Sequence, residues 1–340
     1  MPPVLLNAPP KPPVQYSGAA AGAGTTGHGR EHDVETRSIG ALTVSVVGLG
    51  CNNFGGRIGE AETDAVVGAA LDAGITLFDT ADIYGNVLSE TYLGAALGAR
   101  RDEVVLATKF GAPYDGHEGG GSAAYVRAAV EDSLTRLGTD RIDLYQLHVP
   151  DQKTPIAETI GALGDLVAEG KVREFGCSNF SAAMLEEAAA ATPTGAPGFV
   201  SVQNQYNILH REPEDGVLAE CDRTGMAFLP YFPLASGLLS GKYRAGEPPP
   251  EGARLTNMGE RAAGQLSDER LAKVAALDAV ARRSGHGVLD LAIGWLLSRP
   301  EVASVIAGAT RPEQIAANVA GGGWHLGDDV LAEVDSVAPR

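Results

Sequence analysis

Residues 77–85 read LFDTADIYG, a short apolar run that ends in the carboxylate of Asp79 and continues to the phenol of Tyr84. Three later segments also place polar side chains at the end of an apolar run: Lys109 in VVLATKFG (104–111), His148 in DLYQLHVP (143–150), and Ser178 with Asn179 in REFGCSNF (173–180). Counted from Asp79, the successive intervals are 30, 39 and 30 residues. This spacing is typical of parallel strands joined by helices, whose C-terminal ends meet at one site.

The alternation of apolar runs with helical patterns extends along most of the chain. Eight apolar runs are expected as strands: residues 46–50, 75–81, 103–110, 142–148, 172–179, 199–206, 226–234 and 302–309. Helices are expected over residues 62–74, 89–99, 122–138, 156–170, 181–191, 216–225, 268–285, 288–300 and 311–320. Gly74 and Gly170 are expected to end two helices, and two others would be capped by Ser89 and Ser181. The pattern predicts an α/β fold, a (β/α)8 TIM barrel.

Three regions lie outside this repeat. Residues 35–46 contain two alternating runs separated by turn residues and predict an N-terminal β-hairpin. Residues 1–33 are rich in Pro, Gly, Ala and Thr, so we expect a disordered leader followed by one barrel domain over residues 34–340. The barrel would carry long βα loops. The longest, residues 240–266, is expected to be a functional lid or a disordered loop.

A doubly wound dinucleotide-binding sheet is the alternative fold for such an alternation. That fold requires G-x-G-x-x-G at the start of its first helix and an acidic residue about twenty positions later. The chain has GLGCNNFGG at residues 48–56, which lacks this glycine spacing. The barrel is therefore the better prediction.

Composition narrows the class of function. The chain has 43 Asp and Glu against 26 Lys and Arg, a net charge of −17 that argues against nucleic acid or an anionic membrane as a partner. The longest apolar run is too short to span a bilayer, and the N-terminus does not resemble a secretory signal. Three widely spaced cysteines, without C-x-x-C or H-E-x-x-H, argue against disulfides and a zinc site. We therefore expect a cytoplasmic protein.

The polar groups at the ends of the second, third and fourth strands suit hydride chemistry. A tyrosine with its ordinary pKa of about 10 is a weak acid at neutral pH. The ammonium of Lys109 is expected to lower the pKa of Tyr84, and Asp79 would hold that ammonium charged and in place. His148 could donate a hydrogen bond to a substrate oxygen. Together these groups would protonate an oxygen while a nicotinamide cofactor supplies hydride to the adjacent carbon.

Taken together, the motifs resemble the aldo-keto reductases over roughly residues 36–337. The motifs that carry the resemblance are FDTADIYG (78–85), ATKFG (107–111), LYQLH (144–148), GCSNF (176–180), VQNQYN (202–207), YFPLASGLLSGKY (231–243) and AGATRPEQIAAN (307–318). The Gly-Lys-Tyr and Arg-Pro-Glu-Gln segments are similar to the bacterial and potassium-channel-β-subunit-like branch. The resemblance implies an NADPH-dependent oxidoreductase that reversibly reduces the carbonyl of a small aldehyde or ketone.

The resemblance also implies a role for each polar strand-end residue. Tyr84 would be the general acid, Lys109 and Asp79 would tune it, and His148 would orient the carbonyl. A histidine at this position favours carbonyl reduction over the reduction of a steroid double bond, for which the family carries a glutamate there.

The implied cofactor lies across the strand ends. Ser178, Asn179 and Gln203 would hold the nicotinamide amide, Tyr231 would stack on the nicotinamide ring, and Asp79 is also an implied cofactor contact. The other implied contacts are Gly50, Cys51 and Asn52 from the first strand, Phe232, Pro233, Leu234, Ala235, Ser236, Gly237, Leu239 and Lys242 along the pyrophosphate, and Gly308, Thr310, Gln314 and Asn318 around the adenosine.

Two arginines decide the expected cofactor. Arg254 and Arg311 are the implied ligands of a 2′-phosphate, because guanidinium groups bind phosphate bidentately and helix N-termini favour anions. They would supply a local positive pocket in a strongly acidic chain. NADP(H) is therefore expected in preference to NAD(H).

Two residues depart from the family pattern. Ala317 stands where many members of this branch carry a glutamate near the adenine amino group, so that contact would be missing. Asn52 replaces a bulky aromatic of some relatives and would widen or change the pocket wall. Substrate choice is expected to lie in the loops, above all residues 113–121. A second function stays open, a cofactor-binding redox sensor or auxiliary subunit with little turnover.

Overall fold

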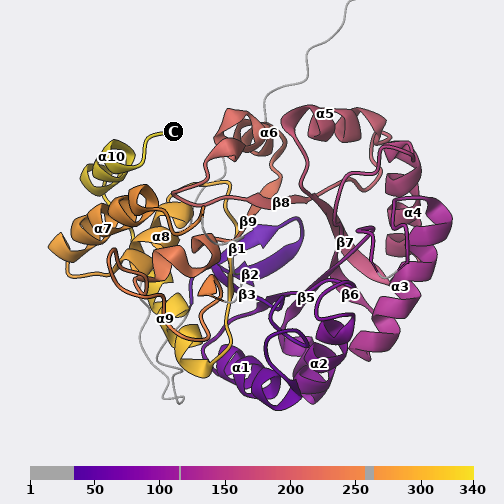
Figure 1. Cartoon of the computed structure of the whole chain (residues 1–340). Coiled ribbons are helices and arrows are strands. Elements are labelled where there is room, and N and C mark those ends of the chain that lie inside the picture. Colours follow the sequence, from indigo (N-terminus) through magenta and orange to yellow (C-terminus); the bar gives the residue numbers. More distant parts are fainter. Residues whose placement is uncertain (1–33, 115, 257–263) are drawn as a thin grey trace, which may run out of the picture. The chain divides into compact units, whose positions relative to one another are not determined.

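The chain folds as a barrel of eight parallel strands in a computed structural model that describes residues 34–114, 116–256 and 264–340 (Figure 1). The strand order is β10-β3-β4-β5-β6-β7-β8-β9, so neighbours in the sheet are mostly neighbours in the chain. The strands are β3 (Val47–Gly50), β4 (Leu77–Asp79), β5 (Val105–Phe110), β6 (Ile142–Leu147), β7 (Val172–Ser178), β8 (Ser201–Gln205), β9 (Ala227–Tyr231) and β10 (Val305–Gly308). The predicted (β/α)8 barrel is confirmed. The predicted leader, residues 1–33, lies outside the described residues.

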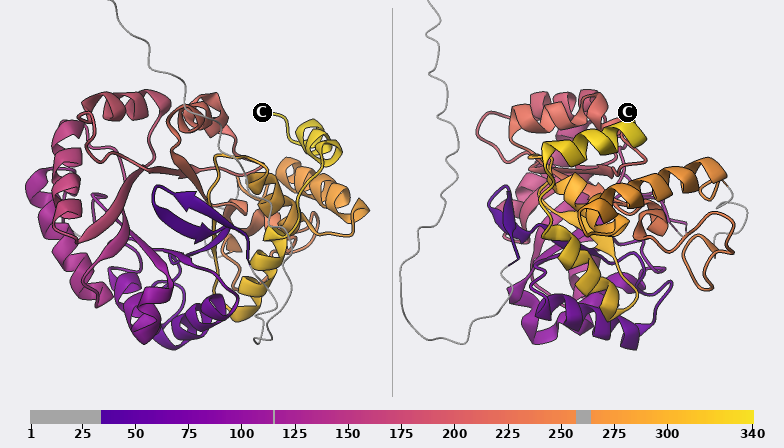
Figure 2. Two further views of the ribbon diagram at one scale, coloured as in Figure 1. Left: turned by 180° about the vertical axis from the view of Figure 1, so that it is seen from behind. Right: turned by 90° about the vertical axis from the view of Figure 1, so that its left-hand side faces the viewer.

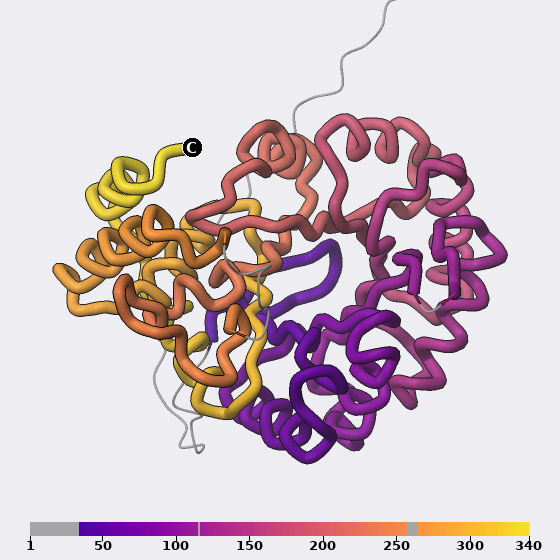
Figure 3. The backbone as a smooth tube through the Cα atoms, in the orientation of Figure 1, coloured from indigo at the N-terminus to yellow at the C-terminus, as the bar shows by residue number. Residues whose placement is uncertain are grey.

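The ring of strands closes at β9. The N–H of Phe228 donates to the carbonyl of Glu301 at 2.7 Å, and its carbonyl accepts from the N–H of Ala303 at 3.0 Å. The chain then enters β10, which pairs in parallel with β3. In Figure 3 the indigo and yellow parts of the backbone trace meet at this pairing.

Helices follow most strands and cover the outside of the barrel. They are α1 (Glu60–Asp72), α2 (Leu88–Leu97), α3 (Ala123–Leu137), α4 (Ile156–Ala168), α5 (Ala182–Ala191), α6 (Val217–Thr224), α7 (Asp268–Arg283), α8 (Val288–Leu297), α9 (Pro312–Gly322) and α10 (Asp328–Val337). Short 3-10 turns cover η1 (Gly98–Glu103), η2 (Glu212–Asp215) and η3 (Ala235–Ser240). Within the described residues, no helix is long and apolar enough to cross a bilayer.

Most of the predicted helix boundaries are confirmed. The hydroxyl of Ser181 accepts a hydrogen bond from the backbone N–H of Met184 and so caps α5. Gly74 and Gly170 follow the ends of α1 and α4 with φ angles of +82° and +77°, a conformation that favours glycine.

Two expectations about the helices were wrong. Ser89 does not cap α2, because the helix begins one residue earlier, at Leu88. The Ser89 hydroxyl is instead buried, 2.8 Å from the hydroxyl of Thr80, and donates to the carbonyl of Cys51 at 2.9 Å. The last helix expected from the sequence is the one over residues 311–320, whereas the structure has a further helix after α9, α10, packed against α7.

The predicted N-terminal hairpin is confirmed and fills one end of the barrel. Strands β1 (Thr36–Ile39) and β2 (Leu42–Ser45) pair antiparallel. Ile39, Leu42 and Val44 are buried in one apolar cluster with residues that begin the barrel strands, including Leu77 and Val105. Seen from behind, the hairpin crosses the ring of strands (Figure 2). Because this end is plugged by side chains, the opposite end, where the strands finish, is left for the site.

Candidate active site

A cavity of about 1000 Å³ lies at the C-terminal ends of the strands. It is lined by these residues that sequence analysis singled out: Gly50, Cys51, Asn52, Asp79, Tyr84, His148, Ser178, Asn179, Gln203, Tyr231, Phe232, Pro233, Leu234, Ser236, Gly237, Lys242, Arg254, Gly308, Thr310, Arg311, Gln314 and Asn318. Three others do not face it. Ala235 and Leu239 are buried in the apolar core, and Lys109 lies behind the cavity wall.

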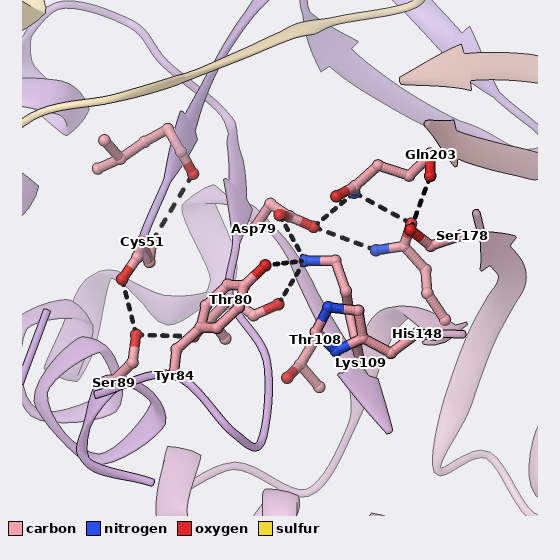
Figure 4. Close-up of polar contacts among 12 residues, drawn as sticks. Cys51, Asp79, Thr80, Tyr84, Ser89, Thr108, Lys109, His148, Ser178 and Gln203 are labelled. Atoms are coloured by element: carbon pink, nitrogen blue, oxygen red, sulfur yellow. Dashed lines mark hydrogen bonds and ion pairs between the residues drawn. The ribbon is translucent and has the colours of Figure 1, made fainter. Parts of the chain in front are cut away.

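Lys109 is the centre of the polar network at the base of the cavity (Figure 4). The residue is 0% exposed, and its ammonium lies 2.6 Å from Asp79 Oδ2. The same ammonium donates to the carbonyl of Thr80 at 2.8 Å and to the phenol oxygen of Tyr84 at 3.4 Å. Burial alone would lower the pKa of Lys109, but Asp79 and Tyr84 outweigh it and raise that pKa. The site therefore holds a permanent positive charge beside a phenol.

Asp79 is fixed by two buried amides as well as by Lys109. Gln146 and Gln203 both donate to its Oδ1, at 3.1 and 3.0 Å. Gln203 also donates to the side-chain carbonyl of Gln146 at 3.3 Å. Gln146 is not among the residues that sequence analysis singled out, because it lies inside an apolar run, on a strand two places from that of Asp79.

Burial dominates the acidity of Tyr84. Burial raises the pKa of Tyr84 above its ordinary value, and the ammonium of Lys109 opposes that rise without reversing it. The expectation that Lys109 lowers the pKa of Tyr84 is therefore only partly met. The phenol is held protonated at neutral pH, which is the form that can donate a proton.

A close contact between two glycine-containing loops fixes the position of Tyr84. Gly85 has a φ of +59°, and a Cβ built there would lie 2.1 Å from the carbonyl oxygen of Phe54. The partner loop also has a positive φ, +73° at Gly55. Only glycine permits this approach of the two backbones. The loop after β3 thus supports the residue that carries the phenol.

His148 lies beside Tyr84 on the cavity wall. The two rings meet edge to face, with centroids 5.7 Å apart. The backbone N–H of His148 donates to the carbonyl of Phe110 at 2.8 Å, which anchors the end of β6 to β5. Burial, assisted by the charge of Lys109, lowers the pKa of His148 to about 3. The imidazole is therefore neutral at physiological pH and has one ring N–H to donate.

Asn179 is oriented by three hydrogen bonds around the end of β7. Its amide nitrogen donates to the carbonyl of His148 at 2.9 Å and to the hydroxyl of Ser178 at 3.1 Å. Its side-chain carbonyl accepts from the phenol of Tyr231 at 2.8 Å. Asn179 also has a φ of +64°, a strained conformation of the kind found at functional sites.

Four cations also line the cavity. Arg57, Lys242, Arg254 and Arg311 all line the cavity, and none forms an ion pair with an acidic side chain of the described residues. Burial and the other three cations lower the pKa of Lys242, as expected where like charges lie close together. Sequence analysis did not single out Arg57, which bridges to the opposite wall by donating to the carbonyl of Gly252 at 3.1 Å.

The remaining lining residues are mostly backbone and small polar groups. The side-chain oxygen of Gln314 accepts from the backbone N–H of Thr310 at 2.7 Å, close to the N-terminus of α9. Cys51 and Cys177 are buried, and burial raises the pKa of both thiols well above the ordinary value. Neither thiol has the exposure or the acidity of a reactive cysteine. Within the described residues there is no cluster of three or more potential metal ligands.

Comparison with known proteins agrees with this geometry. The family model described as Aldo/keto reductase matches residues 46–339. The chain is 35% identical over 305 residues to Aldo-keto reductase YhdN of Bacillus subtilis (strain 168), covering 87% of this chain and 90% of that protein. It is 35% identical over 273 residues to a "Probable voltage-gated potassium channel subunit beta" of Oryza sativa subsp. japonica, covering 78% and 83%. It is 32% identical over 330 residues to Protein tas of Escherichia coli (strain K12), covering 87% and 95%.

Proposed function

We propose that this chain, which belongs to the aldo-keto reductase family, is an NADPH-dependent reductase of small aldehydes or ketones that also runs in the direction of alcohol oxidation. The observation that carries the proposal is the grouping of Asp79, Tyr84 and His148 on the cavity wall, with the buried ammonium of Lys109 behind them and paired to Asp79. Each of these side chains has a defined task in adding a proton to a carbonyl oxygen.

The described residues fit a nicotinamide dinucleotide. Amides and hydroxyls at the ends of β7 and β8 suit the carboxamide, and Tyr231 offers an aromatic face. The four cations, Arg57, Lys242, Arg254 and Arg311, suit phosphate groups, and two of them would bind the 2′-phosphate that distinguishes NADPH from NADH. Among the described residues these four cations have no acidic partner although the chain has a net charge of −17, and bound phosphate groups would explain their presence. When bound, the cofactor would supply a hydride to the carbonyl carbon.

The protein would supply the proton and the orientation. A carbonyl oxygen placed between Tyr84 and His148 would accept a hydrogen bond from the neutral imidazole. As the carbon is reduced, the phenol of Tyr84 would give its proton to that oxygen and become a phenolate. The ammonium of Lys109, 3.4 Å from the phenol oxygen, would stabilise the phenolate. Asp79 keeps this ammonium charged and in place.

The test is turnover by the purified protein. A panel of aldehydes, sugars and keto acids, with 4-nitrobenzaldehyde as the first member, is incubated with NADPH, and cofactor oxidation is followed by absorbance. We expect substrate-dependent oxidation of NADPH and a much higher Kd for NADH, with the reverse reaction seen from the alcohol and NADP+. Failure to bind either cofactor, measured by fluorescence titration, would refute the proposal.

A second candidate is a cofactor-binding redox sensor or auxiliary subunit. The similarity to the rice protein named as a probable channel subunit favours it. Such a protein would bind NADPH tightly but oxidise it no faster with any member of the panel than without substrate. The intact set of Asp79, Tyr84, Lys109 and His148 favours the enzyme, since a protein that only binds the cofactor has no need of a proton donor.

A further inference from the structure

Gln146 is a buried polar residue inside the barrel with no part in the proposed proton transfer. It is 0% exposed and lies on β6, two residues before His148. Its neighbours on the strand, Tyr145 and Leu147, point to the opposite face of the sheet and belong to the large apolar core that includes the outer helices, so Gln146 is buried on the inner face, between two apolar neighbours in the chain. A buried amide among such neighbours is costly unless its polar atoms are paired, so its partners indicate its role.

Those partners are Asp79 and Gln203. Gln146 Nε2 donates to Asp79 Oδ1 at 3.1 Å, and its carbonyl accepts from Gln203 Nε2 at 3.3 Å. Gln203 Nε2 also donates to Asp79 Oδ1, at 3.0 Å, which closes a ring of three side chains from β4, β6 and β8. The carboxylate oxygen of Asp79 and the side-chain carbonyl oxygen of Gln146 therefore both face the NH2 group of Gln203.

This arrangement fixes which way Gln203 points. If the amide of Gln203 were turned over, its own oxygen would lie against Asp79 Oδ1 and the carbonyl oxygen of Gln146, and two hydrogen bonds would become repulsive contacts. The NH2 group of Gln203 is therefore held inside the ring. Gln203 lines the cavity, and its side-chain oxygen is the atom of this amide that can bind a group there. An oxygen there accepts a hydrogen bond and cannot donate one.

We propose that Gln146 is a positioning residue that sets the orientation of Gln203 as a hydrogen-bond acceptor and at the same time holds Asp79 toward Lys109. The inference rests on the proposed function, because the group that Gln203 would receive is the carboxamide N–H of a nicotinamide. Gln146 itself touches neither cofactor nor substrate. Because Gln146 bonds both Gln203 and Asp79, it links recognition of the carboxamide to the position of the Lys109–Asp79 pair.

The acceptor orientation predicts a specific discrimination. The nicotinic acid analogue of NADP+ carries a carboxylate in place of the carboxamide and offers no N–H to Gln203. It would also bring a negative charge toward the Gln203 oxygen. We expect the wild-type protein to bind NADP+ more tightly than this analogue, and we expect the ratio of the two Kd values to depend on Gln146.

The main variant is Gln146→Met, which keeps the length of the side chain and removes both hydrogen bonds. Kd values for NADP+ and the analogue are measured by fluorescence titration, with the unfolding midpoint and the pH profile of kcat measured alongside. We expect the ratio of analogue Kd to NADP+ Kd to fall by about fivefold or more, as for the loss of one or two oriented hydrogen bonds, and the kcat profile to shift along the pH axis. An unfolding midpoint that falls while the Kd ratio and the pH profile stay as in wild type would overturn the inference.

Two further variants keep the test decisive. Ser201→Ala removes a buried hydroxyl that has no partner among the described residues, on the same strand as Gln203, and should leave the Kd ratio and the pH profile unchanged. Gln146→Glu can accept from Gln203 in either protonation state but can donate to Asp79 only while protonated, so its Kd ratio should stay near wild type while its kcat profile shifts along the pH axis. A Kd ratio as low as that of Gln146→Met would contradict the inference. If the wild-type protein binds no NADP+ at all, the proposed function itself fails.

Discussion

The ammonium of Lys109 and the carboxylate of Asp79 lie 2.6 Å apart in a part of the barrel that water hardly reaches, with 0% and 3% of the two residues exposed. A buried ion pair of this kind is costly to form, because both charges lose their hydration. Lys109 also donates to the carbonyl of Thr80, and Asp79 also accepts from Gln146 and Gln203, so further polar atoms of the pair are satisfied. The pair is therefore best explained by the chemistry of the neighbouring phenol rather than by stability.

Breaking this pair should destabilise the fold strongly. We expect Asp79→Asn to lower the free energy of unfolding by roughly 3–5 kcal/mol, because an uncompensated ammonium stays buried. Urea unfolding measures the change. The double variant Asp79→Leu/Lys109→Met removes both charges and should be less destabilised than Asp79→Asn. A double variant at least as destabilised as Asp79→Asn would contradict this view of the pair.

The contact between the loops that carry Gly85 and Phe54 should tolerate no side chain. We expect Gly85→Ala to lower the free energy of unfolding by more than the control Gly138→Ala, with an extra loss of about 1–3 kcal/mol from overpacking. Gly138 has a similar φ, +63° against +59°, but a Cβ there meets nothing within 4 Å. Equal losses in the two variants would show that the φ angle alone matters and that the contact does not support Tyr84.

Stability should fall with rising pH through the ionisation of Asp82. Burial, with the carboxylate of Glu90 as a like charge, raises the pKa of Asp82 to about 7, against partial opposition from Arg136 and Lys109. The folded state thus holds a proton that the unfolded state releases near pH 4, so the contribution of Asp82 to stability is lost between about pH 4 and 7. Asp82→Asn cannot ionise. Unfolding curves across this range should show the variant gaining on wild type as pH rises, whereas parallel curves would contradict the assignment.

The four-cation cluster should select the cofactor. We expect Arg311→Ala to raise the Kd for NADPH by about 10–100-fold, as for the loss of hydrogen bonds to a charged group, and to change the Kd for NADH by less than about threefold. Fluorescence titration of both cofactors measures this. Arg57→Ala is a second test, because Arg57 is another of the four cations. This substitution also removes the hydrogen bond to the carbonyl of Gly252. Equal weakening of NADPH and NADH by Arg311→Ala would place that arginine elsewhere than at the 2′-phosphate.

The sequence alone was sufficient to predict the barrel and the polar residues at the ends of its strands. In parallel barrels the C-terminal ends of the strands meet at one face, so Asp79, Lys109, His148 and Ser178 are brought together by topology without any knowledge of side-chain contacts. The same reasoning places Tyr84 in the loop just beyond its strand.

Residues whose role depends on a contact across the barrel were not predicted. Gln146 lies in a strand that is buried on both faces, where no polar–apolar alternation reveals which side chains point inward. Arg57 follows two glycines in a loop, and its partner, Gly252, is 195 positions away in the chain. Ser89 has the residue type of a helix cap, but its hydroxyl is taken up by the buried contacts with Thr80 and Cys51.

The central claim, that Tyr84 gives the proton to the substrate oxygen, is tested most directly by Tyr84→Phe. The variant removes the phenol oxygen and keeps the ring that packs against His148. Single-turnover oxidation of NADPH with 4-nitrobenzaldehyde is compared with wild type at saturating cofactor, together with the Kd for NADPH. The account predicts a loss of about 10²–10⁴-fold in the rate of turnover with a Kd that stays within about threefold of wild type. A variant that reduces the aldehyde at the wild-type rate would contradict it.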